Sequence, residues 1–367
     1  MRIALLAPLV SAISEPFLGG AQAMLADLAR GLQQRGHEVT LFARQGSSVA
    51  DVRIEAIDVP ESVRPANFSR PADAQTPDPG FFDQANLFLD LCLRLQQRSQ
   101  EFDLFHAHAF DWPIFALGPL LGKPLIHTIH LPAISPEINA GLKILHEQGH
   151  RTTLVTVSQA CARTYLPYTP MDAVIYNGLD FSAIPFTSEV TSDAPLLFAG
   201  RITPEKGLEA AIEIAARSGK RLLIAGGIYD QRYFKDKIEA RLRQSSDHTQ
   251  YLGLLERQQL WQIMSHSLGL LCPIEWDEPF GLTQVEALAT GTPVIAYRRG
   301  ALDEIIQHEQ TGFLIPPGAR LEAALAVEQL PHISRSACRA SVDPRFSLEK
   351  MLLAYEQLYF EVSQTKH

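Results

Sequence analysis

The stretch EWDEPFGLTQVEALATG spans residues 275–291 and holds two glutamates, Glu278 and Glu286, on either side of a Pro-Phe-Gly turn. A residue that precedes proline avoids helical geometry, so we expect Glu278 in a loop and Glu286 on the helix that follows. Gly281 permits close approach to the backbone, and the unpaired amides at a helix start attract anions and hydroxyl groups. The stretch therefore predicts a polar ligand held at a helix N-terminus.

The whole chain has the composition of a soluble globular protein with two domains. Its 367 residues are too many for one ordinary core, and 46% of them are hydrophobic. It carries 32 basic and 41 acidic residues, which gives a net charge of −9. This balance argues against nonspecific attraction to nucleic acid or to an anionic membrane surface.

Cysteine usage and the N-terminal sequence predict a cytoplasmic protein. Four scattered cysteines in apolar surroundings indicate buried thiols in a reducing compartment: Cys92, Cys161, Cys272 and Cys338. The first apolar run, IALLAPLV, lacks the cleavage pattern of a signal peptide and predicts a strand. No apolar stretch approaches the ~20 residues of a membrane span, so no integral membrane segment is expected.

The first half of the chain alternates buried strands with helices. Strands are predicted at residues 2–7, 37–43, 103–108, 125–130 and 152–157. A helix opens at Gly20 and ends at Gly36, and another covers residues 81–100. Residues 60–80, rich in Pro, Asp, Ser and Ala, predict a long surface loop.

The second half repeats this alternation after a linker at residues 182–195. Strands are predicted at residues 196–199, 222–226, 251–253, 268–272, 294–296 and 312–315. A charged helix is predicted at 230–244 and a final amphipathic helix at 346–362. Both halves are therefore expected to be parallel sheets with crossover helices, their loops facing each other across a cleft.

The loop GRITPEKG at residues 200–207 joins the first strand of the second half to a helix. Arg201 and Lys206 bracket this loop, and two cations beside the amides of a helix start can neutralise a diphosphate. An arginine can also grip two oxygens at once. The loop predicts a binding site for a diphosphate.

Histidines close two strands of the first half and permit two interpretations. His106 and His108 lie on the same side of one strand end, and His127 and His130 close the next. With Asp111, the first pair suggests a metal-dependent hydrolase, because imidazoles two residues apart on a strand can share an ion. No later His/Asp cluster completes a ligand set. Hydrogen-bonded strand-end histidines are the other interpretation, above all for His106 and His127.

Several of these motifs resemble family 4 retaining glycosyltransferases. The resemblance rests on EPFGL with its second glutamate eight residues after the first, and on ALATGTPVIA, GGAQ, RGHEVTLFA, GRITPEKG, DLFHAH and HTIH. It implies the B-type glycosyltransferase fold: α/β, with two Rossmann-like doubly wound parallel-sheet domains facing a cleft. The implied domains are an acceptor-binding domain at 1–181, a nucleotide-sugar-binding domain at 182–345, and a helix at 346–367 that crosses back to the first.

The resemblance also implies roles for individual residues. Glu278 would hold the transferred sugar, Glu286 the ribose, and Arg201 with Lys206 the diphosphate. The full donor-binding set is Gly20, Arg201, Lys206, Gly226, Glu278, Pro279, Phe280, Gly281, Leu282 and Glu286. His130 would position the sugar or acceptor and joins Glu278, Arg201 and Lys206 in the catalytic set, with His108 and Asn177 on the acceptor side. No metal ligand is implied.

The implied reaction is metal-independent transfer of a hexose, with retention of configuration, from a nucleoside diphosphate sugar to an acceptor hydroxyl. A UDP-sugar is favoured, no other cofactor is expected, and the acceptor is a small molecule, a glycan or a lipid-linked molecule. The oligomeric state stays open. The alternatives are the metal-dependent hydrolase, a non-catalytic nucleotide-sugar-binding protein and, on the same fold, a sugar-nucleotide epimerase.

Overall fold

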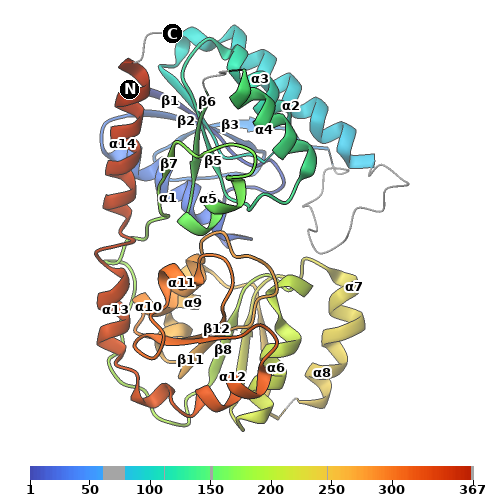
Figure 1. The fold of residues 1–367 in the computed structure, drawn as a ribbon, viewed down its shortest axis with the longest axis vertical. Coiled ribbons are helices and arrows are strands. Elements are labelled where there is room, and N and C mark those ends of the chain that lie inside the picture. The colour runs from blue at the N-terminus through green and yellow to red at the C-terminus, as the bar shows by residue number, and fades with distance from the viewer. Residues whose placement is uncertain (61–78, 111, 149–151, 246, 365–367) are drawn as a thin grey trace. The chain divides into compact units, whose positions relative to one another are not determined.

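In the computed structural model, two parallel β-sheets organise the chain over the described residues, 1–60, 79–110, 112–148, 152–245 and 247–364 (Figure 1). The chain forms two units, Met1–Ser14 with Ala21–Gly178 and Leu348–His367, and Glu15–Gly20 with Leu179–Ser347. The prediction of two Rossmann-like parallel-sheet domains is confirmed. Residues 61–78 of the predicted surface loop, and Asp111, lie outside the described residues.

The first unit is built on a sheet whose described strands run in the order β3-β2-β1-β4-β5-β6-β7, each pair parallel. The strands are β1 (Arg2–Leu6), β2 (Glu38–Arg44), β3 (Arg53–Ile57), β4 (Leu104–Ala107), β5 (Leu125–Ile129), β6 (Thr152–Thr156) and β7 (Ala173–Val174). Both β4 and β5 are buried along their whole length. Such continuous burial explains why the sequences of these strands are mostly apolar, with His106, His127 and Thr128 as buried polar exceptions.

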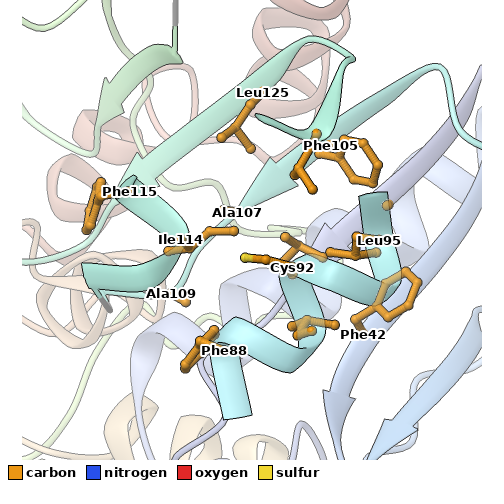
Figure 2. Packing of buried hydrophobic residues seen from close by; sticks show 14 of the residues in the cluster. Phe42, Phe88, Cys92, Leu95, Phe105, Ala107, Ala109, Ile114, Phe115 and Leu125 are labelled. Carbon is orange, nitrogen blue, oxygen red and sulfur yellow. The ribbon is translucent and has the colours of Figure 1, made fainter. Parts of the chain in front are cut away.

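Helices cover this sheet and supply its core. They are α1 (Gly20–Gln34), α2 (Pro79–Gln97), α3 (Trp112–Leu117), α4 (Pro136–Glu147), α5 (Gln159–Tyr165) and α14 (Leu348–Gln364), with 3₁₀ turns at Ser99–Glu101 and Gly118–Leu121. Figure 2 shows Cys92 and Leu95 of α2 in one apolar cluster with Phe105 of β4. Ser158 caps α5 as expected, its Oγ accepting from the Cys161 amide at 2.9 Å.

An edge strand and a helix differ from the sequence-based expectation. Strand β3 was not predicted, because its sequence RIEAI carries two charges and lies at the sheet edge, where only β2 pairs with it. The charged helix expected at 230–244 is interrupted. It consists of α7 (Gln231–Tyr233), a π-helical turn at Phe234–Ile238 and α8 (Glu239–Gln244).

The second unit has its own parallel sheet, whose described strands run in the order β10-β9-β8-β11-β12-β13. The strands are β8 (Leu196–Ala199), β9 (Leu222–Ala225), β10 (Thr249–Gly253), β11 (Gly269–Cys272), β12 (Val294–Tyr297) and β13 (Gly312–Ile315). The chain moves outward from β8 to β9 and β10, then returns to β11 on the other side of β8. Ligands of open α/β sheets bind beyond the carboxyl ends of strands at such a reversal.

Helices of the second unit follow its strands. They are α6 (Leu208–Arg217), α9 (Arg257–Ser265), α10 (Leu282–Ala289), α11 (Leu302–Ile305), α12 (Arg320–Val327) and α13 (Arg335–Val342), with 3₁₀ turns at Pro204–Lys206 and Leu330–His332. Arg335 begins α13 and is buried. Its guanidinium donates to the carbonyls of Thr187, Ser265 and Ser267 and to Thr292 Oγ1, at 2.7–3.0 Å. Burial lowers the pKa of Arg335 to about 10.

Helix α14 is joined to the first sheet by a buried hydrogen-bond chain. His106 on β4 bonds through Nδ1 to Tyr359 Oη at 2.7 Å and through Nε2 to Thr128 Oγ1 at 2.8 Å. The same threonine oxygen lies 3.0 Å from Tyr355 Oη. His106, Thr128 and both tyrosines are fully buried, and burial holds the pKa of His106 well below its usual value.

His127 on β5 is a second fully buried histidine. Its Nε2–H donates to the carbonyl of Ala109 at 2.6 Å, and its ring stacks on Phe115 with 4.0 Å between centroids. Burial lowers its pKa to about 3. The interpretation of His106 and His127 as hydrogen-bonded strand-end histidines agrees with these contacts.

Acidification from pH ~6.5 to ~4 should lower the free energy of unfolding, because His106 and His127 stay neutral when folded and take up protons when unfolded. Above pH ~6.5 both histidines are neutral in the folded and in the unfolded protein, so they do not change the free energy of unfolding there. Below it, each histidine removes about 1.4 kcal/mol per pH unit. In urea titrations at several pH values, His127→Asn should reduce the slope of the free energy of unfolding against pH by about one proton. His332→Asn, at an exposed position, should leave that slope unchanged. An unchanged slope in His127→Asn would contradict the assignment.

Candidate active site in the second unit

The loop after strand β8 carries the two predicted cations, Arg201 and Lys206, the latter at the end of the Pro204–Lys206 turn. Gly207 follows with φ of +73°, in the left-handed region that favours glycine. A Cβ on Gly207 would overlap the carbonyl of Pro273, just beyond strand β11. Glycine therefore allows the β8 loop to pack closely against the β11 loop.

Lys206 and Glu278 form an ion pair at this junction. Lys206 Nζ donates to Glu278 Oε2 at 2.7 Å, and the two side chains are 17% and 14% exposed. Trp276 Nε1 donates to the same oxygen at 2.9 Å, and Lys206 Nζ lies 5.1 Å from the Trp276 ring centroid. The sequence predicts a cation for phosphate and a carboxylate for sugar, and the structure brings both into direct contact.

The backbone around Glu278 is fixed by a neighbouring loop. The Ala301 amide donates to the Glu278 carbonyl at 2.8 Å, and a Cβ on Gly300 would overlap the Glu278 backbone. Pro279 and Phe280 are both buried, the latter 3% exposed. Glu278 thus lies in a loop, as predicted, and that loop is held on both sides.

Arg201 has surroundings of the same kind as Lys206. Its Nη2 lies 3.5 Å from Glu205 Oε1, and its guanidinium carbon lies 5.3 Å from the Tyr229 ring centroid. The Glu205 carbonyl accepts from the Glu275 amide at 2.8 Å. Each of the two cations therefore lies close to one carboxylate and to one aromatic ring.

Helix α10 begins at Leu282, after Gly281 with φ of +103°, and carries Glu286 as predicted. Glu286 is 8% exposed. Its Oε1 lies 3.6 Å from Arg257 Nε, and the Arg257 guanidinium lies 4.9 Å from the Trp261 ring centroid. The second carboxylate thus also has an arginine close by.

Gly226 and Gly20 occupy tight positions. The Gly226 amide donates to the Gly253 carbonyl, and the Gly226 carbonyl accepts from Tyr251 Oη, both at 2.8 Å. Gly20 ends the segment Glu15–Gly20, which belongs to the second unit. A Cβ on Gly20 would lie 2.9 Å from Leu282 Cδ1.

The predicted acceptor-side residues belong to the first unit. His108 Nδ1 lies 3.0 Å from His130 Nε2, and their rings stack with 5.3 Å between centroids. Burial lowers the pKa of His130 to about 4 and that of His108 well below its usual value. Both imidazoles are therefore neutral near pH 7, so one ring donates to the other. His108 Nε2 and Asn177 Oδ1 are buried without a hydrogen-bond partner among the described residues.

The histidine metal site receives no support from the residues that can be described. Both ring nitrogens of His106 are used in hydrogen bonds, so it could bind an ion only by breaking one of them. Over the described ranges, no group of three His, Cys, Asp or Glu side chains could hold a metal ion. Asp111, the third proposed ligand, lies outside them.

Sequence reasoning missed three aromatic or basic neighbours of these residues: Trp276, Tyr229 and Arg257. Trp276 lies inside the glutamate stretch, two residues before Glu278, and its position there was the one available signal. Tyr229 lies in the loop after β9, and Arg257 begins helix α9, which follows β10. Their places depend on the folded sheet.

Among the helices that the structure describes, not one combines the length and the apolar character needed to cross a bilayer.

Solved structures share this architecture over the full chain. Sucrose-phosphate synthase from Thermosynechococcus elongatus is 20% identical with a TM-score of 0.82, and all of both chains is covered. The Anabaena protein Alr3699/HepE, solved with UDP-glucose, is 19% identical with a TM-score of 0.73, covering 98% of this chain and 100% of the other. At these identities the likeness concerns the fold.

Sequence comparisons identify the family. The glycogen synthase of Mycobacterium tuberculosis strain H37Rv is 27% identical over 386 residues, covering 93% of this chain and 91% of the relative. The model of Glycosyltransferase Family 4 matches residues 18–183, and the model of glycosyl transferases group 1 matches residues 183–340. The chain therefore belongs to the family 4 glycosyltransferases, enzymes that have the B-type fold.

Proposed function

We propose that this glycosyltransferase moves a hexose from a nucleoside diphosphate sugar, preferably a UDP-sugar, to an acceptor hydroxyl with retention of configuration and without a metal ion. The observation that carries the proposal is the Lys206–Glu278 pair at 2.7 Å, formed beyond the carboxyl ends of β8 and β11. Open α/β sheets bind nucleotides at this kind of reversal. The cation that we assign to the phosphate and the carboxylate that we assign to the sugar lie there together.

Departure of the leaving group is the step that the cations assist. As the bond between the anomeric carbon and the β-phosphate oxygen breaks, negative charge grows on the diphosphate. Lys206, Arg201 and the first amides of α10 are suited to stabilise that charge. Two cations and a helix start can supply the charge stabilisation that a divalent ion supplies elsewhere, which supports a metal-independent reaction.

Transfer is completed by the acceptor. Its hydroxyl oxygen forms the new bond to the anomeric carbon on the face that the leaving group vacates, and its proton passes to the departing phosphate oxygen. Glu278 orients the sugar through its hydroxyl groups, and Glu286 binds the ribose diol. No side chain acts as a covalent nucleophile in this scheme.

Neutral histidines suit the acceptor side. With a pKa of about 4, His130 is uncharged near pH 7 and can donate or accept a hydrogen bond with a sugar hydroxyl. His108 holds one nitrogen of His130 at 3.0 Å. We assign His130 to positioning the sugar or acceptor, and His108 and Asn177 to the acceptor side.

The preference for uridine has support of a different kind. The Anabaena structural neighbour was solved with UDP-glucose, and the named products of the sucrose-phosphate synthase and the glycogen synthase differ. Because those products differ, the relatives do not assign the acceptor. We leave the acceptor as a small molecule, a glycan or a lipid-linked molecule.

Thermal unfolding with UDP, GDP, ADP and dTDP, each with and without EDTA, tests the donor assignment. UDP at ~100 times its dissociation constant should stabilise the fold by about 2.7 kcal/mol, a rise in melting temperature of roughly 3–4 °C for a chain of this length. EDTA should not change that rise. Stabilisation by zinc but by no nucleotide would favour the hydrolase instead.

Lys206→Ala should lower turnover by roughly tenfold to several hundredfold, because Lys206 acts where charge develops in the transition state. The dissociation constant of the intact donor should change less than kcat. Lys235→Ala, at an exposed position of the same unit, is the matched control. Near wild-type kcat in Lys206→Ala would exclude a catalytic role for this cation.

Glu286→Ala should weaken donor binding by about 1.5–3 kcal/mol, the value of hydrogen bonds to a charged group. Isothermal titration with UDP should already reveal the loss, since the ribose belongs to the nucleotide. Glu322→Ala, on the exposed side of α12, should bind UDP normally. Unchanged UDP affinity in Glu286→Ala would remove the ribose role.

A further inference from the structure

The side chain of Trp276 contacts both members of the Lys206–Glu278 pair. Its indole Nε1–H donates to Glu278 Oε2 at 2.9 Å, while its ring face lies 5.1 Å from Lys206 Nζ. The side chain is half-buried. A tryptophan thus supplies a hydrogen-bond donor to the anion and a π face to the cation at the same time.

The two oxygens of Glu278 have different surroundings. Oε2 accepts from both Lys206 and Trp276. Oε1 accepts no hydrogen bond within the described ranges of the chain. One oxygen is therefore fixed by the protein, and the other is available to a ligand hydroxyl.

The Lys206 ammonium is the less permanent of the two donors to Oε2. It is a compact charge on a flexible stem, and a bound diphosphate would compete with Glu278 for it. The indole N–H is a single donor whose direction is fixed by a rigid ring, so it stays directed at Glu278 Oε2. If both donors were lost, a partly buried carboxylate would be left without a partner, which is costly.

We propose that Trp276 is a positioning residue that keeps Glu278 oriented, with Oε1 toward the sugar, when Lys206 turns to the donor's diphosphate. The inference rests on the proposed function and deepens it, because it makes Trp276 a determinant of sugar discrimination. The nucleotide itself is bound by other groups. Trp276 should therefore affect recognition of the sugar more than recognition of UDP.

Trp276→Phe tests this directly, since phenylalanine keeps a ring face for Lys206 and removes only the N–H. We expect kcat/KM for UDP-glucose to fall roughly tenfold to a hundredfold, the loss typical of one hydrogen bond to a charged group. UDP affinity should stay within about threefold, equivalent to less than one hydrogen bond. Trp112→Phe, an exposed tryptophan of the first unit, is the matched control.

Sugar discrimination separates positioning from general loop packing. The ratio of kcat/KM between the preferred UDP-hexose and its epimer at one hydroxyl should move toward unity in Trp276→Phe and stay unchanged in Trp112→Phe. If Trp276 only packs the loop, UDP affinity and both sugars should weaken alike, with the ratio preserved. That pattern, or wild-type kinetics in Trp276→Phe, would overturn the proposal.

A second measurement needs no active variant. The chain has three tryptophans, so the indole N–H of Trp276 can be assigned in a ¹H–¹⁵N spectrum by its disappearance in Trp276→Phe. In the wild-type protein saturated with UDP-glucose, it should remain protected from solvent exchange. An exposed indole N–H in that complex would overturn the proposal even if Trp276→Phe is inactive.

The wild-type protein in the same assays separates the two levels of inference. A wild-type chain that transfers glucose from UDP-glucose while Trp276→Phe matches it supports the proposed function and sinks the role of Trp276. A wild-type chain that binds none of UDP, GDP, ADP and dTDP and transfers sugar from none of the corresponding nucleotide sugars overturns both.

Discussion

The ion pair between Lys206 and Glu278 is the constraint on which the arrangement of the second unit's site depends. It joins the loop after β8 to the loop after β11, the two strands between which the sheet reverses its order. Burying two charges is costly unless their remaining hydrogen-bonding capacity is used. Here a third group, the Trp276 indole, adds a hydrogen bond to the carboxylate, and Gly207 and Gly300 allow the backbones to approach closely enough for the pair to form.

The ion pairs also determine which groups contact the two cations when no donor is bound. Lys206 and Arg201 each lie beside a glutamate and an aromatic ring, so neither cation faces the site alone. Exposed positive charge is not needed to bind a donor diphosphate. The diphosphate can replace the glutamates as the partner of cations that are already oriented. Preorganised groups of this kind lose little entropy when charge develops on the leaving group, which is the physical basis of electrostatic catalysis.

Much of the fold and part of the site could be predicted from the sequence. Continuous apolar runs predicted the central strands, and Pro279 placed Glu278 in a loop ahead of the helix that carries Glu286. Strand β3 was missed because an edge strand is buried on fewer sides and its charged residues hide the pattern. The contact between Lys206 and Glu278, and the arginine beside Glu286, could not be predicted. They join residues brought together only by sheet order, and local sequence carries no record of such partners.

The histidines show why residue type alone does not assign a role. His106 and His108 lie two positions apart at the end of one strand, yet His106 is consumed by a hydrogen-bond chain to α14, whereas His108 bonds to His130. Burial makes all of these imidazoles neutral near pH 7, and neutral imidazoles in mutual contact avoid the repulsion that two cations would feel. This suits the role proposed for His130, because a neutral ring can both donate and accept a hydrogen bond with an uncharged sugar hydroxyl. Burial in the first unit therefore determines the protonation state of the histidines at its strand ends.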